Sequence, residues 1–338
     1  MKKLSGGSIW FETPLSVSAF ASAAGPKEND GPLSGKFDFA AEEPCIGEDS
    51  WEKSESSLIT KTFGKAIEKA RLAPSEVDFV FAGDLLNQCV GTVFGLRDFK
   101  VPFIGVYGAC STMAESLALA SVFISSGLGQ NAAAITSSHF CSAERQFRMP
   151  VNYGGQRTPT SQWTATAAGC AVVSPKAQPP YITGATFGTI TDMGVKDSAN
   201  MGAAMAGAAY ETITAHLSAH GTHPRDYDLI LTGDLGVVGS GILRDLLHKD
   251  GVDISNVHND CGLLLYDLER QDVHAGGSGA GCSAAVLCAD ILPKLQCGEL
   301  HRVLFVATGA LMSAMTAQQG ESIPGIAHAI EFTSKVTN

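Results

Sequence analysis

Apolar and polar positions follow two different periods along this chain, and the same series of segments occurs twice. In the first half, residues 8–24 alternate bulky and small side chains as a strand does, and residues 50–71 carry apolar positions at helical spacing. The same reasoning predicts strands at 78–82, 102–107 and 132–136, and an almost wholly apolar, hence buried, helix at 111–126. The second half repeats the series, with helices near 199–220, at 239–248 and at 281–297, and strands at 228–232 and 302–308. Residues 140–180 are too irregular to assign.

The two halves share sequence as well as pattern. Residues 78–84 match residues 228–234 at an offset of 228 − 78 = 150, whereas Cys110 matches Cys282 at an offset of 282 − 110 = 172. The difference, 172 − 150 = 22 residues, predicts an insertion in the second half, which we place around 256–260. We therefore expect a duplicated α/β protein whose halves are 1–178 and 179–338.

Composition narrows the class of protein. With 45% hydrophobic and 17% charged residues, the 338-residue chain is typical of a well-buried globular protein. A net charge of −11 argues against nucleic acid as a partner, because phosphate binding needs a basic surface. No apolar run is long enough for a membrane helix, and the start lacks the apolar region of a secretory signal. Nine cysteines without a CxxC pair indicate free thiols in a reducing, cytosolic compartment.

Cys110 is the leading candidate for chemistry. Gly108-Ala109 end a strand and turn directly into a helix, so that Cys110 and Ser111 lie at a helix N-terminus. The unpaired N–H groups and the helix dipole at such a position favour a thiolate or a bound anion. A buried structural cysteine is the alternative, and Cys282 occupies the same place in the second half.

Three further residues are predicted to line a ligand pocket together with Cys110 and Ser111. His258 and Asn259 lie in the expected insertion, and loops added to a scaffold often carry its function. His274 precedes the glycine run at 276–281, which lacks the spacing of a phosphate or dinucleotide loop. We expect no cofactor.

A second group of histidines has the spacing of a metal site. His216, His220 and His223 are separated by four and three residues, but Gly221 and Pro224 place them at a helix end, where imidazole also favours the helix dipole. We expect no metal here.

The residues around Cys110 also carry a family resemblance. The duplicated halves, with 108–111 leading an Ala/Leu-rich helix, resemble thiolases and 3-oxoacyl-acyl-carrier-protein synthases III. Residues 8–11, 105–116 and 156–164 make the chain resemble, more specifically, the SpoVAD family of endospore-forming bacteria. The resemblance implies a thiolase-like fold of two halves in five α-β-α-β-α layers. We also expect strands 78–82 and 228–232 in separate sheets, and a homodimer formed through strand 132–136.

The same resemblance implies a function. A member of this family is expected in the forespore, at the cytosolic face of the inner membrane, held there by other SpoVA membrane proteins. There it would bind dipicolinic acid (pyridine-2,6-dicarboxylate) or its calcium chelate during uptake. A helix N-terminus suits one carboxylate of this flat dianion. The net charge of −11 opposes long-range attraction of a dianion, so either local donors dominate or the neutral chelate binds.

The chain departs from the condensing enzymes at two places. In the synthases a catalytic histidine closes the strand equivalent to 228–232, where this chain has Gly233-Asp234. A second catalytic His or Asn leads the last buried helix, where this chain has 276–278. We therefore expect no catalytic residue and no condensation. The alternatives are an acyltransferase or condensing enzyme that uses Cys110 as nucleophile, and a structural scaffold for membrane proteins.

Overall fold

Ten strands form two sets of five with the same order. The computed structural model describes the chain except residues 148–156, 176–177 and 337–338. The first set runs in the order β5-β4-β6-β8-β2 and the second in the order β11-β10-β13-β14-β9. The first set comprises β2 (Ser8–Ala24), β4 (Phe79–Gly83), β5 (Phe103–Gly105), β6 (Ala132–Ser138) and β8 (Ala167–Ser174). The second comprises β9 (Tyr181–Phe187), β10 (Leu229–Thr232), β11 (His258–Asp260), β13 (Arg302–Ala310) and β14 (Gly325–Thr333). The duplication expected from the sequence is therefore present in the topology.

Strand β2 joins the two sets into one sheet. Its N-terminal part pairs antiparallel with β9 from Ser8 to Ser16, and its C-terminal part pairs with β8 from Ser16 to Ala24. The expectation that strands 78–82 and 228–232 lie in separate sheets is wrong, because the hydrogen-bonded path runs unbroken from β5 to β11. The reason is the length of β2: its 17 residues are enough for two partners in succession.

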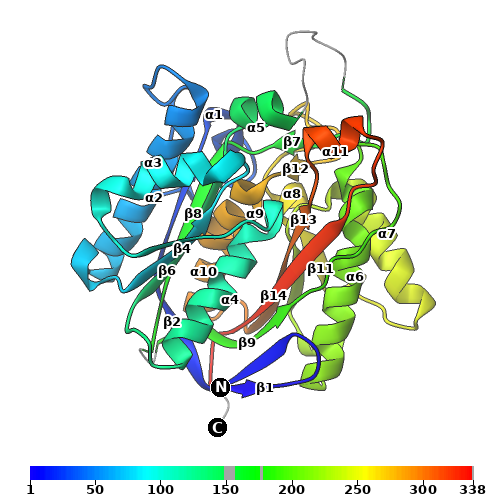
Figure 1. Ribbon diagram of the computed structural model, residues 1–338. Coiled ribbons are helices and arrows are strands. Elements are labelled where there is room, and N and C mark those ends of the chain that lie inside the picture. Colours follow the sequence, from blue (N-terminus) through cyan, green and yellow to red (C-terminus); the bar gives the residue numbers. More distant parts are fainter. Residues whose placement is uncertain (148–156, 176–177, 337–338) are drawn as a thin grey trace.

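Helices complete five layers around this folded sheet (Figure 1). One outer layer holds α2 (Trp51–Ala70) and α3 (Val90–Leu96), which pack on the first set of strands, and the other holds α6 (Met201–His220) and α7 (Gly236–Lys249). The central layer holds α4 (Thr112–Ser125) and α9 (Ala280–Val286), which contact each other. A short π-helical turn continues α9 into α10 (Leu292–Cys297). The largest apolar core surrounds α4 and α9 and includes Met113, Leu117 and Val286, all fully buried.

Shorter elements connect these layers. They are β1 (Lys2–Lys3), α1 (Pro26–Asn29), β3 (Phe39–Ala40), α5 (Phe140–Phe147), β7 (Trp163–Thr164), α8 (Cys261–Leu264), β12 (Gly277–Ser278) and α11 (Ala314–Gln318). No helix among the described residues is long and apolar enough to cross a membrane.

Two sequence-based expectations need correction. Strand β6 is paired on both sides, with β4 and β8, so it offers no free edge through which a dimer could extend the sheet.

Most of the insertion lies after residues 256–260. Strand β11 takes the place in the second half that β5 takes in the first, because His258 pairs with Ile230 and Phe103 pairs with Val80. At this point the offset between the two halves is therefore only 258 − 103 = 155 residues. The remaining 172 − 155 = 17 residues fall between β11 and Cys282 and form α8, β12 and the loop between them.

Candidate ligand-binding site around Cys110

Cys110 lies in a tight turn between β5 and α4. Residues Ala109–Ser111 form a single 3-10 turn, and Ala109 has a left-handed backbone with φ of 51°. Strand β13 of the second half packs directly on this turn, where a Cβ at Gly309 would lie only 2.3 Å from the Gly108 carbonyl oxygen. Glycine at 309 therefore allows the two halves to meet at the cysteine.

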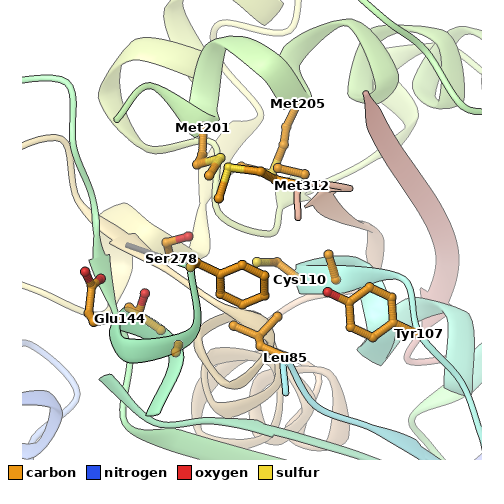
Figure 2. A pocket seen from close by; sticks show the side chains of 13 residues that line it. Leu85, Tyr107, Cys110, Glu144, Met201, Met205, Ser278 and Met312 are labelled. Carbon is orange, nitrogen blue, oxygen red and sulfur yellow. The ribbon is translucent and has the colours of Figure 1, made fainter. Parts of the chain in front are cut away.

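A pocket opens above Cys110 between the two halves (Figure 2). It encloses about 530 Å³, counting its open mouth. Figure 2 shows Met201, Met205 and Met312 gathered on the side opposite Leu85 and Tyr107, with Cys110 between them. The full lining consists of Leu85, Tyr107, Ala109, Cys110, Ala143, Glu144, Phe147, Thr164, Met201, Met205, Ser278, Ala310 and Met312. The described lining is thus mainly apolar, contains one acidic side chain and has no lysine, arginine or histidine.

The carboxyl group of Asp234 lies beneath the pocket and gathers donors from three segments. Its Oδ2 accepts from the Ser278 hydroxyl and from the Gly279 backbone N–H, both at 2.9 Å. Its Oδ1 accepts from the Thr308 hydroxyl at 2.8 Å. The Cys110 thiol also donates to this carboxyl group. Burial raises the pKa of Asp234, and these donors oppose the rise.

Cys110 is therefore held as a thiol. Burial, followed by the charge of Asp234 and its hydrogen bond to the thiol, raises the pKa of Cys110 well above its usual range. Of the two alternatives that the sequence left open for Cys110, the raised pKa favours a buried, protonated cysteine over a thiolate. Desolvation and a neighbouring carboxylate outweigh the backbone N–H groups.

A second buried carboxyl group fixes the end of β10. Asp260 accepts from the Thr232 hydroxyl at 2.6 Å and from the backbone N–H groups of Leu235 and Gly236 at 2.9 and 3.0 Å. Burial, with a smaller contribution from Asp234, raises the pKa of Asp260 to about 7. This carboxyl group holds the turn into α7, and so positions Asp234 under the pocket.

Of the residues selected from the sequence, only Cys110 lines this pocket. The Ser111 hydroxyl instead donates to the Gly108 carbonyl oxygen at 2.6 Å and holds the cysteine turn. On β11, His258 Nε2 lies 3.0 Å from the Thr232 hydroxyl, and the Asn259 side chain accepts from the next backbone N–H. His274 pairs with the exposed Asp272 at 3.2 Å. A ligand contact at these four residues stays a prediction.

The structure separates the two helix-leading cysteines. Cys282 is fully buried in the central core and is absent from the pocket lining. Sequence reasoning also missed Asp234 as a site residue, although Gly233-Asp234 was visible as the departure from the condensing enzymes. The three methionines gave no local signal, because they come from two segments about a hundred positions apart in the chain.

Comparison with known proteins identifies close relatives in sequence. Residues 6–333 match the family model of stage V sporulation protein AD (SpoVAD). The chain is 46% identical over 331 residues to stage V sporulation protein AD of Bacillus subtilis (strain 168), covering 98% of each chain.

Solved structures share the fold at much lower identity. The 3-oxoacyl-[acyl-carrier-protein] synthase III of Aquifex aeolicus VF5 is similar with a TM-score of 0.59 at 15% identity, over 94% of this chain and 99% of that one. The priming β-ketosynthase of the R1128 polyketide pathway is similar with a TM-score of 0.55 at 15% identity, over 93% and 96%. The expected thiolase-like α/β fold is thereby confirmed, and at this identity the likeness concerns the fold alone.

Proposed function

The chain belongs to the SpoVAD family of stage V sporulation proteins, and from this membership we propose that it binds dipicolinic acid in the Cys110 pocket without chemical turnover. It would serve the uptake of this ligand into the developing spore. One observation carries the proposal: the fold of condensing enzymes keeps a pocket over its cysteine, while the thiol is hydrogen-bonded to the Asp234 carboxyl group.

The lining favours a flat ring over a flexible chain. Three methionines and Tyr107 surround the pocket, and thioether sulfur makes favourable contacts with aromatic rings. Hydroxyl groups of Tyr107, Thr164 and Ser278 supply a few polar contacts. This pattern, mostly apolar with a few fixed polar groups, is typical of small-molecule sites.

Charge favours the calcium chelate of dipicolinate as the bound form. A free dianion would lose its hydration among described lining residues that provide no cation, which is costly. The chelate is neutral, and its calcium still accepts oxygen ligands.

The absence of turnover follows from the protonated thiol. Acyl transfer needs a thiolate, whereas burial and, after it, the charge of Asp234 raise the pKa of Cys110 here. In the resembling synthases a histidine occupies the place of Asp234 and takes part in the chemistry. Incubation with malonyl- and acetyl-thioesters is expected to leave Cys110 unmodified by mass spectrometry. A stable acyl adduct at normal enzyme rates would favour the condensing-enzyme alternative.

Location and partners follow from the same family. We propose a peripheral protein at the forespore side of the inner membrane, recruited by other SpoVA membrane proteins, and a homodimer. Because β6 is internal, the free edge of the first strand set is β5, where Phe103 is 41% exposed. We therefore place the dimer contact at β5.

Isothermal titration with dipicolinate, with and without Ca²⁺, tests the ligand. We expect saturable binding that is tighter in the presence of Ca²⁺. Cys110→Trp should abolish binding by filling the pocket, while Cys110→Ala should weaken it only modestly. The matched control is Cys297→Trp, the same change at an exposed cysteine.

One further variant separates this pocket from the site expected from sequence. His258→Ala should leave binding unchanged if the ligand lies against Cys110. If His258 bound a carboxylate, its loss would weaken affinity by about 10- to 150-fold, corresponding to about 1.5–3 kcal/mol. Unchanged affinity in folded Cys110→Trp protein would contradict the proposed pocket.

A further inference from the structure

We propose that His216, His220 and Glu331 form a binding site for a divalent transition-metal ion of the zinc class, contrary to the expectation from the sequence. The two histidines lie in the last turns of α6, and Glu331 lies on β14. Met201, at the start of α6, lines the Cys110 pocket, so at 1.5 Å per residue His220 lies about 28 Å further along the helix. The proposal is therefore independent of the proposed function.

The three residues are close enough to share one ion, but the His216 and His220 rings stack with centroids 4.1 Å apart and 18° between their planes, so one ring must turn about its Cβ–Cγ bond for both to face the ion. Residues four apart lie on the same helix face, and one ligand atom from each of the three residues lies within 4.8 Å of the others. His216 Nε2 is 3.5 Å from Glu331 Oε2, longer than the roughly 2.7–2.9 Å of a charge-assisted hydrogen bond. Two ligand atoms each about 2.0–2.2 Å from a tetrahedral zinc ion would be separated by a similar distance. Two imidazoles and a carboxylate are also a common zinc ligand set.

His220 supplies the second, independent observation. Both of its ring nitrogens are buried and have no hydrogen-bond partner among the described residues. The ring occupies space left by Gly184, whose Cβ, if present, would lie 2.6 Å from His220 Cε1. Burying two polar nitrogens without partners costs stability, and a bound ion would satisfy one of them.

Neighbouring side chains already orient the other two ligands. The Thr186 hydroxyl lies 2.9 Å from His216 Nδ1, which leaves Nε2 facing Glu331. Such a hydrogen bond on the outer nitrogen is usual for metal-bound histidine. The Thr183 hydroxyl donates to Glu331 Oε1 at 2.6 Å.

Arg302 limits how the ion can bind. Arg302 and Tyr227 each donate to Glu331 Oε2 at 2.8 Å. The ion would therefore take the place of the His216 contact with this oxygen and leave the other two in position. The neighbouring guanidinium weakens cation binding, and His220 is the one residue of the three that is only partly buried. A bound ion would link the end of α6 to β14.

Zn²⁺ titration followed by thermal unfolding tests the site. In the wild-type protein, saturating Zn²⁺ is expected to raise Tm by at least about 2 °C, because an ion bound only by the folded state stabilises it. His220→Ala should lose this shift, whereas His223→Ala, three residues further on and outside the cluster, should keep it. If His220→Ala does not fold, His220→Phe replaces it, since phenylalanine fills the same space without a ligand atom.

The absorption spectrum of bound Co²⁺ distinguishes binding at this site from binding to any of the nine cysteines. Histidine and carboxylate ligands are expected to give only weak visible bands, whereas thiolate ligands add intense near-ultraviolet bands. No Tm shift in the wild type, an equal shift in the folded His220 variant, or thiolate bands in the wild-type spectrum would each overturn the proposal.

Discussion

Asp234 follows β10, with donors from Ser278, Gly279 and Thr308 around its carboxyl group. The arrangement keeps a buried carboxyl group in place, and burial together with this carboxyl group keeps Cys110 protonated. The same residue thus has a structural role and a chemical one. Substitution can separate these roles, because an amide of the same shape removes the charge.

Asp234→Asn is expected to lower the pKa of Cys110 and to destabilise the fold. The charge that raises the thiol pKa is gone, and the amide nitrogen faces a donor with which it cannot pair, at a cost of about 1–3 kcal/mol. Alkylation of Cys110 by iodoacetamide across pH, followed by peptide mass spectrometry, should show half-maximal reactivity at lower pH than in the wild type. Reactivity of Cys297 provides an internal control, and an unchanged Cys110 profile would show that Asp234 does not set the thiol pKa.

The sequence was informative about Cys110 and uninformative about most of its neighbours. The cysteine was recognisable because a Gly-Ala turn leads a buried helix twice in the chain. The pocket wall was not, because Met201 and Met312 come together only through the packing of α6 against the second strand set. His258 attracted attention as a polar residue in an apparent insertion, whereas the register places it on β11, opposite Ile230.

At the scale of elements, several strands were visible in the sequence. β2 is confirmed at Ser8–Ala24, and the predicted segment 302–308 corresponds to β13. β8 was missed because it lies within residues 140–180, which were too irregular to assign, and its eight buried residues show no alternation. β9 and β14 were also unassigned. They lie in the part of the sheet where β2 joins the two sets of strands, and the sequence did not predict this connection.

The free edge at β5 makes the proposed dimer testable. Phe103→Lys is expected to shift the protein from dimer to monomer, because a charge on an exposed edge opposes strand pairing and apolar contact. Sedimentation should then detect a 35.2 kDa species at micromolar concentration in place of one of twice that mass. Leu128→Lys, at a residue 61% exposed outside this edge, is the matched control. A wild-type protein that sediments as a monomer would contradict the dimer itself.

At the scale of the whole molecule, buried acids make stability depend on pH. Glu55 on α2 accepts hydrogen bonds from Ser137 and Ser142, and burial, together with the nearby Asp84, raises its pKa to about 8. An unfolded glutamate ionises near pH 4.3. Between about pH 4.3 and 8 the unfolded chain therefore releases a proton that the folded chain keeps, so the free energy of unfolding falls as pH rises.

Glu55→Gln should remove this part of the pH dependence. The amide keeps an acceptor for one serine and cannot ionise, so the variant should gain stability relative to the wild type between pH 5 and pH 8. Each unit of pKa difference corresponds to about 1.4 kcal/mol. Urea unfolding at the two pH values measures the difference. Glu68→Gln, at an exposed position on the same helix, is the control, and an equal stability difference at both pH values would contradict the role of Glu55.

The position of β2 in the chain also has a consequence for synthesis on the ribosome. This strand is made almost first, yet its main partners, β8 and β9, begin only at Ala167 and Tyr181. Until they emerge, β2 has most of its length unpaired, and such a strand is open to association with other chains. The pairing of Ser8 to Ser16 with β9 also waits for the first strand of the second half. The nascent chain therefore exposes an edge of β2 until β9, made directly after the first half, has left the exit tunnel.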